Sequence, residues 1–151
     1  MTRLVLTLMF LAVLYGCSAP EGAAEKDVAQ EGEPMDIQTR TWRLDRLGDK
    51  VMPEGDKSPT LSLDPSSGRA SGFAGCNRYF ADYKLDGSSL TLGPVGATKR
   101  LCDKEAMAIE DAFLAALGGG TMQVTAAGET LTMSGADKQS LEFAVAKSDE
   151  S

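Results

Sequence analysis

The residues best suited to chemistry lie in SGFAGCNRYF, residues 71–80, where Cys76 precedes Asn77, the only asparagine of the chain. A cysteine in this position could act as a nucleophile, bind a metal or form a disulfide. A catalytic thiol needs a neighbouring base, and the chain contains no histidine. Zinc needs four suitable ligands, and Cys76 and Cys102 alone do not supply them. A redox pair usually has C-x-x-C spacing, which these two cysteines lack.

The first residues predict the compartment, and with it the state of the cysteines. Arg3 precedes an apolar run over residues 4–15 that is too short to span a bilayer as a mature helix. We therefore interpret residues 1–16 as a secretory signal peptide. The ending Leu-Tyr-Gly-Cys resembles the bacterial lipobox, in which the cysteine, here Cys17, becomes the lipidated first residue. Ser18, which follows the cysteine, favours sorting of a lipoprotein to the outer membrane. The alternative to a lipoprotein signal is an ordinary signal peptide that ends in cysteine.

If Cys17 is lipidated, two cysteines remain in an oxidising compartment. An even number there favours a disulfide between Cys76 and Cys102. This disulfide would close the loop from residue 76 to residue 102, and closing a loop of that length stabilises a domain by about 3.5 kcal/mol in the chain-entropy model. Two unpaired, buried thiols are the alternative, and a reactive site is the least favoured interpretation.

Charge and composition describe the remainder of the mature chain. Removal of residues 1–16 leaves 14 basic and 22 acidic residues, a net charge near −8, which disfavours binding to nucleic acid. Residues 17–38 contain the candidate lipidated cysteine and a stretch rich in Ala, Glu, Gly and Pro, which we interpret as a flexible acidic tether about 25 Å in end-to-end distance. We expect the folded domain over 39–146 and a short tail over 147–151.

The domain shows the alternation typical of strands. The first four predicted strands are TWRLDRL at 41–47, TLSL at 60–63, the segment from Arg69 to Phe73 and the run 77–87. The run 77–87 has the clearest period of two. Further strands are expected at 89–92, and then in MQVTA, TLTMS and SLEFAV, which short turns separate.

One segment has a helical period instead. Over 103–117, an apolar face recurs at Ala106, Ile109 and Phe113, acidic residues occupy the first turn, and Gly118 ends the run. The predicted fold is mainly β, an α+β arrangement. We expect an antiparallel curved sheet or small barrel of about 7–9 strands, with this helix packed on a face or at an end.

At this point the motifs resemble a known family. TW-x-L, then GCNRYFADY, then a threonine four residues before a cysteine (Thr98 and Cys102), then E-x-x-F-L in the helix, are similar to the META domain, also called HslJ-like, of bacterial envelope lipoproteins. The resemblance covers about residues 39–146. It implies a compact antiparallel β domain without an established enzymatic activity or catalytic residues, and some members are associated with heat shock or novobiocin resistance. Arg100-Leu101 departs from the Met-Ala that the family often has before the second cysteine.

Four residues form a candidate binding or structural corner: Asn77, Arg78, Tyr79 and Thr98. A recognition role for the Asn-Arg pair is one interpretation. The favoured one is local, because asparagine tolerates unusual backbone angles and satisfies backbone groups beside a bent strand. Tyr79 and Tyr83 share one strand face and Phe80 the other, so an exposed aromatic there is the best candidate for contacting a partner.

The leading functional hypothesis is a non-catalytic, membrane-anchored envelope lipoprotein that supports stress tolerance or antibiotic resistance through binding. Alternatives are a binder of small apolar ligands, which requires an apolar pocket, and an adaptor or pilot for an outer-membrane protein assembly, which requires a free strand edge or groove. We expect a monomer on the periplasmic side, anchored to the outer membrane through its N-terminal lipid, with no metal and no cofactor. Lys99 and Arg100 are interpreted as a solvated basic pair.

Overall fold

The computed structural model describes residues 36–118, 120–136 and 139–147. The predicted signal peptide, Cys17, most of the predicted tether and residues 148–151 lie outside these ranges. Within them, no helix is both long and apolar enough to cross a membrane.

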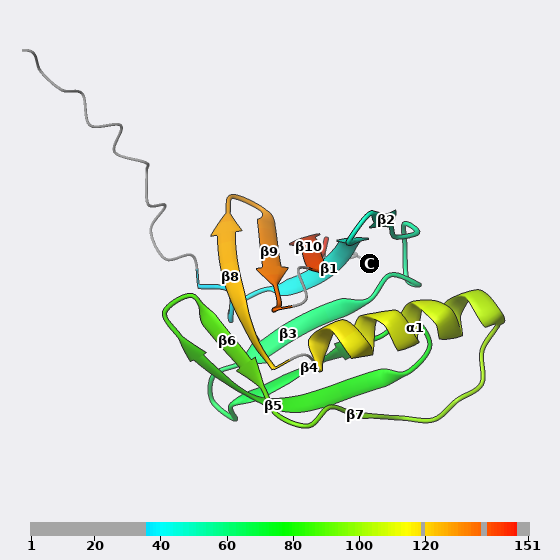
Figure 1. The fold of residues 1–151 in the computed structure, drawn as a ribbon, viewed down its shortest axis with the longest axis horizontal. Helices are drawn as coiled ribbons and strands as arrows, with labels where there is room; N and C mark the ends of the chain where they lie inside the picture. The colour runs from blue at the N-terminus through cyan, green and yellow to red at the C-terminus, as the bar shows by residue number, and fades with distance from the viewer. Residues whose placement is uncertain (1–35, 119, 137–138, 148–151) are drawn as a thin grey trace, which may run out of the picture. The chain divides into compact units, whose positions relative to one another are not determined.

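The domain is an antiparallel β-barrel with one helix (Figure 1). Eight strands form the barrel, in the order β10-β9-β8-β6-β5-β4-β3-β1, and β10 pairs again with β1 to close the ring. Their bounds are β1 (Thr41–Leu47), β3 (Thr60–Asp64), β4 (Arg69–Phe73), β5 (Arg78–Asp86), β6 (Ser89–Leu92), β8 (Thr121–Ala127), β9 (Thr130–Ser134) and β10 (Ser140–Val145). Two outer strands, β2 (Lys50–Val51) and β7 (Gly96–Ala97), pair with β1 and β5. The predicted fold class is confirmed.

Alternation along the strands explains the barrel interior. In β5 the inward residues Tyr79, Ala81 and Tyr83 are buried, and the residues between them are exposed. An eight-stranded barrel is just wide enough to be filled by its own side chains. Here the largest fully buried side chains are Trp42, Leu44, Leu61, Tyr79, Leu90, Phe113, Leu117, Met122, Leu131, Met133, Leu141 and Phe143.

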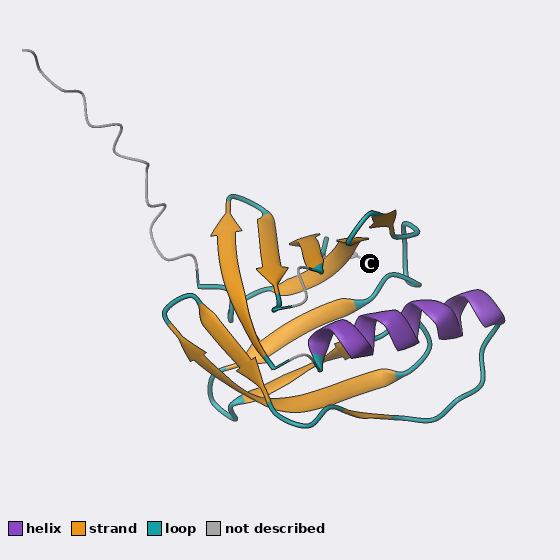
Figure 2. Cartoon of the chain, in the orientation of Figure 1, coloured by secondary structure: helices purple, strands orange, loops and turns teal. Residues whose placement is uncertain are grey.

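The helix α1 (Lys104–Leu117) interrupts the strands between β7 and β8 (Figure 2). Its side chains Ile109, Phe113 and Leu117 belong to this core. Asp103 caps its first turn, because the Asp103 Oδ1 accepts a hydrogen bond of 2.9 Å from the backbone N–H of Ala106. Phe113 packs edge-on against Tyr79 of β5 at 5.5 Å and against Phe143 of β10 at 6.4 Å between ring centroids. One helical side chain thus joins two widely separated strands.

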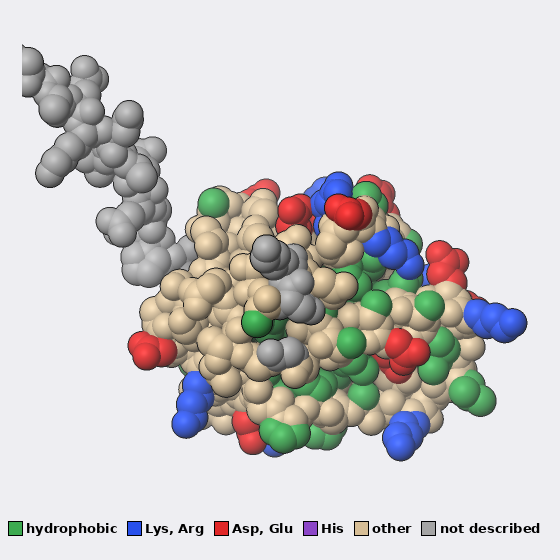
Figure 3. Space-filling model, viewed as in Figure 1, with side chains coloured by type: hydrophobic (Ala, Val, Ile, Leu, Met, Phe, Trp, Pro, Cys, Tyr) green, Lys and Arg blue, Asp and Glu red, His purple; other side chains and the backbone are tan. Residues whose placement is uncertain are grey.

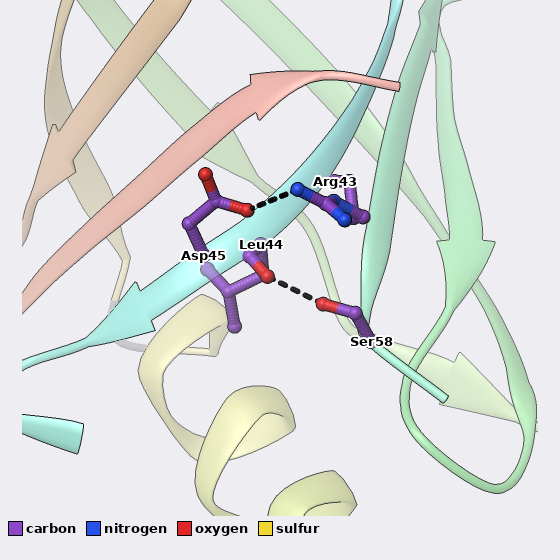
Figure 4. Close-up of polar contacts among 4 residues, drawn as sticks. All are labelled: Arg43, Leu44, Asp45 and Ser58. Atoms are coloured by element: carbon purple, nitrogen blue, oxygen red, sulfur yellow. Dashed lines mark hydrogen bonds and ion pairs between the residues drawn. The ribbon is translucent and has the colours of Figure 1, made fainter. Parts of the chain in front are cut away.

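The loop that follows β2 is bonded to β1 beside an irregularity in that strand. The register between β1 and β10 shifts between Leu44 and Arg46, and the side chain of the intervening Asp45 accepts a hydrogen bond of 2.9 Å from Arg43 (Figure 4). At the same point, the buried Ser58 donates its hydroxyl to the Leu44 carbonyl. The 52–59 loop is therefore held against the barrel by a buried hydrogen bond.

The folded part begins earlier than the predicted boundary near Thr39. Ile37 is 6% exposed and belongs to the hydrophobic core, and its carbonyl accepts a hydrogen bond of 2.9 Å from the Trp42 indole. A buried indole N–H needs such a partner. Ile37 therefore belongs to the domain and not to the tether range in which the sequence analysis included it.

Candidate functional site

The candidate corner lies where the turn between β4 and β5 meets the segment that leads from β7 into α1. A disulfide joins Cys76 of the turn to Cys102 of the segment, with their Cα atoms 6.0 Å apart. Cys76 is buried and Cys102 is exposed. The pairing that the cysteine count favoured is present in the structure, and the two thiols are therefore not free.

The turn at Gly75 needs a glycine for two reasons. Its φ is +113°, which is unfavourable for residues with a side chain. A Cβ at this position would also lie 3.1 Å from the Ile109 Cγ2 and 3.3 Å from the Ala106 carbonyl oxygen of α1. This backbone conformation places Cys76 and Asn77 directly against the helix.

Asn77 is the centre of the corner, and its side-chain amide makes four hydrogen bonds. Its Nδ2 donates to the Arg100 carbonyl at 3.2 Å and to the Glu110 Oε1 at 2.9 Å. Its Oδ1 accepts from the Thr98 hydroxyl at 3.0 Å and from the Arg100 backbone N–H at 2.7 Å. The full hydrogen-bonding capacity of an asparagine side chain is used. Asn77 therefore holds together the turn, the 98–100 segment and the helix.

Glu110 is the residue of this corner that the sequence analysis missed. Its side chain is on the buried side of α1, only 6% exposed, and it accepts from both the backbone N–H of Asn77, at 2.6 Å, and the Asn77 amide. Two hydrogen bonds to a carboxylate offset part of the cost of burying it. A signal was available, because position 110 is four residues after Ala106 and three before Phe113, which places it in the apolar stripe.

The other predicted site residues divide between the corner and the core. Thr98 belongs to the corner, and besides its bond to Asn77 its hydroxyl accepts from the Arg78 backbone N–H at 3.2 Å. The Arg78 side chain is exposed. Tyr79 points into the barrel, where its hydroxyl donates to the Thr60 carbonyl at 2.8 Å and burial raises its pKa. Tyr79 is thus a core residue and not a member of the corner.

The outer face of β5 presents the exposed aromatic that alternation predicted. Phe80 is 48% exposed, whereas Tyr83 is buried and donates to the Gln38 side chain. The Arg69 guanidinium lies 5.6 Å from the Phe80 ring centroid, a cation–π arrangement. The ring also packs on Gly96 of β7, since a Cβ there would lie 2.8 Å from it. Phe80 is held in place yet remains half accessible.

A surface groove adjoins the C-terminal half of α1. It has a volume of about 530 Å³ and is lined by Leu92, Gly93, Pro94, Val95, Leu114, Ala115 and Gly118. Apolar side chains gather along the helix and the strands beside it in Figure 3. The groove lies outside the barrel, whose interior is occupied by the core side chains.

The chemistry open to the corner is limited by what its residues already do. Its sulfur atoms are bonded to each other, and the asparagine and glutamate side chains are hydrogen-bonded to one another or to backbone. Over the described residues, no group of three or more His, Cys, Asp or Glu side chains is placed to hold a metal ion. The arrangement is suited to fastening a loop and a helix to a barrel.

The fold and the corner define a class: a small antiparallel barrel whose single helix and preceding loop are fastened to the β4–β5 turn by a disulfide and an asparagine. Residues 35–148 match the model of the META domain, and the chain belongs to the META-domain family. The expected family is thus confirmed over a slightly longer range than 39–146.

Solved structures share this fold. An NMR structure of a protein from Burkholderia xenovorans is 28% identical, with a TM-score of 0.63, and the match covers 74% of this chain and 85% of that one. A second NMR structure is 24% identical, with a TM-score of 0.61, and covers 75% and 94%. A crystal structure of a DUF4847 family protein from Bacteroides vulgatus shares the fold at 14% identity, a TM-score of 0.53 and coverage of 76% and 97%. No curated protein matches the chain.

Proposed function

We propose that this protein is a non-catalytic, lipid-anchored envelope protein of the outer membrane, which acts by binding and contributes to tolerance of envelope stress or antibiotics. Three features support the proposal: the lipobox-like ending at Cys17, the disulfide, which is typical of an oxidising compartment, and membership of the META-domain family. The periplasm is the compartment that accommodates all three.

One observation carries the binding part of the proposal. The polar side chains that could have served catalysis, Asn77 and Glu110, are buried and engaged with each other. Phe80, by contrast, is an aromatic side chain held half exposed on the outer face of β5. Exposed, rigid aromatic residues are enriched at binding surfaces. The accessible chemistry of the domain is therefore that of contact with a partner.

A deletion strain tests this proposal. We expect loss of the protein to increase sensitivity to envelope stresses or to antibiotics, and the complete gene to restore tolerance. Cys17→Ser should fail to restore it if the anchor is needed, and Phe80→Ala should fail if the exposed ring makes the contact. Lys84→Ala is the matched control, because Lys84 is exposed on the same face of the same strand. A deletion strain that behaves as wild type under every stress would contradict the proposal.

Binding of a small apolar ligand is a second candidate, supported by the groove beside α1. Ala115 lines the groove and is exposed on the helix, whereas Ala112 is exposed on the helix without lining it. If the groove binds apolar ligands, a fluorescent fatty-acid analogue should bind the wild type and Ala112→Arg equally and Ala115→Arg more weakly. Equal binding by both variants, or none by the wild type, would remove this candidate.

The adaptor hypothesis has less support. An adaptor that accepts a partner peptide by strand addition needs a free strand edge. Barrel closure pairs every barrel strand on both sides, and the outer strands β2 and β7 offer only two residues each. Cross-linking in intact envelopes, followed by purification of the protein, would test for a specific partner.

A further inference from the structure

The most exposed large apolar side chain in the described part of the chain lies beside the disulfide. Leu101 is 94% exposed, compared with 65% for Val51 and 48% for Phe80. Single exposed leucines are common on protein surfaces and need no explanation by themselves. What distinguishes this one is how firmly the backbone on either side of it is held.

Both neighbours of Leu101 are fastened to the barrel. On one side, the Arg100 backbone N–H and carbonyl are both bonded to the Asn77 side chain, at 2.7 Å and 3.2 Å. On the other side, Cys102 is bonded to Cys76. The Arg100 guanidinium also donates to the Cys76 carbonyl at 3.2 Å. The corner therefore holds the intervening residue in one orientation, with its apolar side chain in solvent.

The two residues that precede Leu101 have the opposite charge to the protein as a whole. The segment Thr98–Cys102, TKRLC, contains Lys99 and Arg100, both exposed, and no acidic residue, in a chain whose net charge is −7. Asp103 follows and stays ionised, because the backbone N–H of Ala106 that it caps lowers its pKa, and the exposed Lys104 comes next. In Figure 3, blue, red and green side chains all stand toward the right end of the view, where Figure 1 shows the stretch leading into α1.

We propose that the Leu101 loop, residues 98–102, is a membrane-docking loop that inserts Leu101 into the interface of an anionic phospholipid bilayer while Lys99 and Arg100 face the lipid phosphates. Apolar tips flanked by cations bind membrane interfaces in this way, with the cationic groups attracted by anionic headgroups. The rest of an acidic protein is repelled by such a surface, so this loop is favoured as the point of approach.

The length of the preceding chain is compatible with this geometry. Eighteen residues lie between Cys17 and Asp36, where the described domain begins. A stretch of that length reaches at most about 65 Å when fully extended, which exceeds twice the radius of gyration, about 26 Å, of a domain of this size. A domain anchored at Cys17 can therefore lie on the bilayer surface. The inference thus rests on the proposed lipid anchor.

The test uses Leu101→Trp in the full chain as cells produce it, reconstituted in vesicles that contain phosphatidylglycerol with brominated acyl chains. Trp42 is fully buried, so the unsubstituted protein supplies the background. We expect the fluorescence at position 101 to be quenched and blue-shifted, and Lys99→Glu in the same background to reduce the quenching. Ala127→Trp is the control, because Ala127 is exposed at the end of β8, away from the loop in Figure 1, and should not be quenched.

Flotation of the vesicles separates this inference from the proposed anchor. Protein that floats with the vesicles without quenching at position 101 would overturn the docking loop and leave the anchor intact. Protein that does not float would contradict the anchor. An excess of added vesicles would then still test the docking loop, because quenching at position 101 would support insertion and its absence would overturn it. A blue shift that depends on protein concentration and occurs without vesicles would overturn the inference in favour of a protein partner, such as a second copy.

Discussion

Replacement of Asn77 by alanine tests the structural role of the corner. The change removes four hydrogen bonds and leaves the buried Glu110 carboxylate with only the backbone N–H of residue 77 as a donor. An unsatisfied buried acceptor costs about 1–3 kcal/mol, and more when it is charged. Thr98 and Arg100 are exposed, so water replaces their lost bonds at little cost. We expect the free energy of unfolding to fall by about 3 kcal/mol.

Urea denaturation of the purified protein measures this loss from the midpoint and slope. Arg78→Ala is the matched control, since it changes the next, exposed side chain and should shift stability by no more than about 0.5 kcal/mol. A double-mutant cycle with Glu110→Ala should give a coupling energy of about 1–2 kcal/mol, because removal of both partners leaves no unsatisfied carboxylate. An Asn77→Ala variant as stable as the wild type, or additive effects in the cycle, would refute the reasoning.

Three further predictions follow from the same structure. Cys102→Ser should lower the unfolding free energy by about 3.5 kcal/mol, and a urea midpoint unaffected by both this change and a reductant would argue against a stabilising disulfide. Gly75→Ala should lower the unfolding free energy by about 2–3 kcal/mol, because residue 75 has a φ of +113° and packs against the helix. Gly87→Ala should lower it by about 1 kcal/mol, because residue 87 has a φ of +55° with open space around it. Equal losses would contradict the close packing at Gly75. Hydrogen bonds from the Ser66 hydroxyl and from neighbouring groups lower the pKa of Asp64 from 3.8 to about 2. The stabilising effect of the ionised Asp64 carboxylate is therefore complete above pH 3.8 and is lost as the pH falls through about 2. An NMR titration of Asp64 should show a midpoint of about 2, and Ser66→Ala should raise that midpoint.

Local patterns predicted most of the elements because each depends on nearby residues. The alternation of Tyr79, Ala81 and Tyr83 with polar or exposed residues is typical of a strand with one buried face, and β5 has such a face. Gly118 ends the helix as expected, and Asp103, which was expected in the first turn, is the N-cap one residue before it; capping is also a local property. Such features could be read without knowledge of the neighbours in space.

Barrel closure and the corner could not be predicted in this way, because they depend on contacts distant in sequence. The pairing of Trp42 with Val145 closes the ring, and nothing local to either residue indicates the other. Glu110 and Asn77 are separated by 33 positions, and only the fold brings the carboxylate to the amide. The helical period did place Glu110 on the buried face, so the need for a buried partner was foreseeable, but its identity was not.

The corner also explains why a segment with the composition of a reactive site is structural. Cysteine, asparagine and a positive-φ glycine lie together because a sharp turn has to bind both a loop and a helix within a few residues. Its consequence for function is indirect. The same contacts that consume the polar groups of the turn fix Arg100 and Cys102, and with them the exposed Leu101 between those two residues.

The most direct test of the account is peptide mapping by mass spectrometry of the protein purified from cell envelopes, with free thiols blocked at lysis. The account predicts one disulfide-linked peptide pair containing Cys76 and Cys102, which separates on reduction. Both cysteines recovered as blocked free thiols would contradict the fastened corner and the oxidising compartment together.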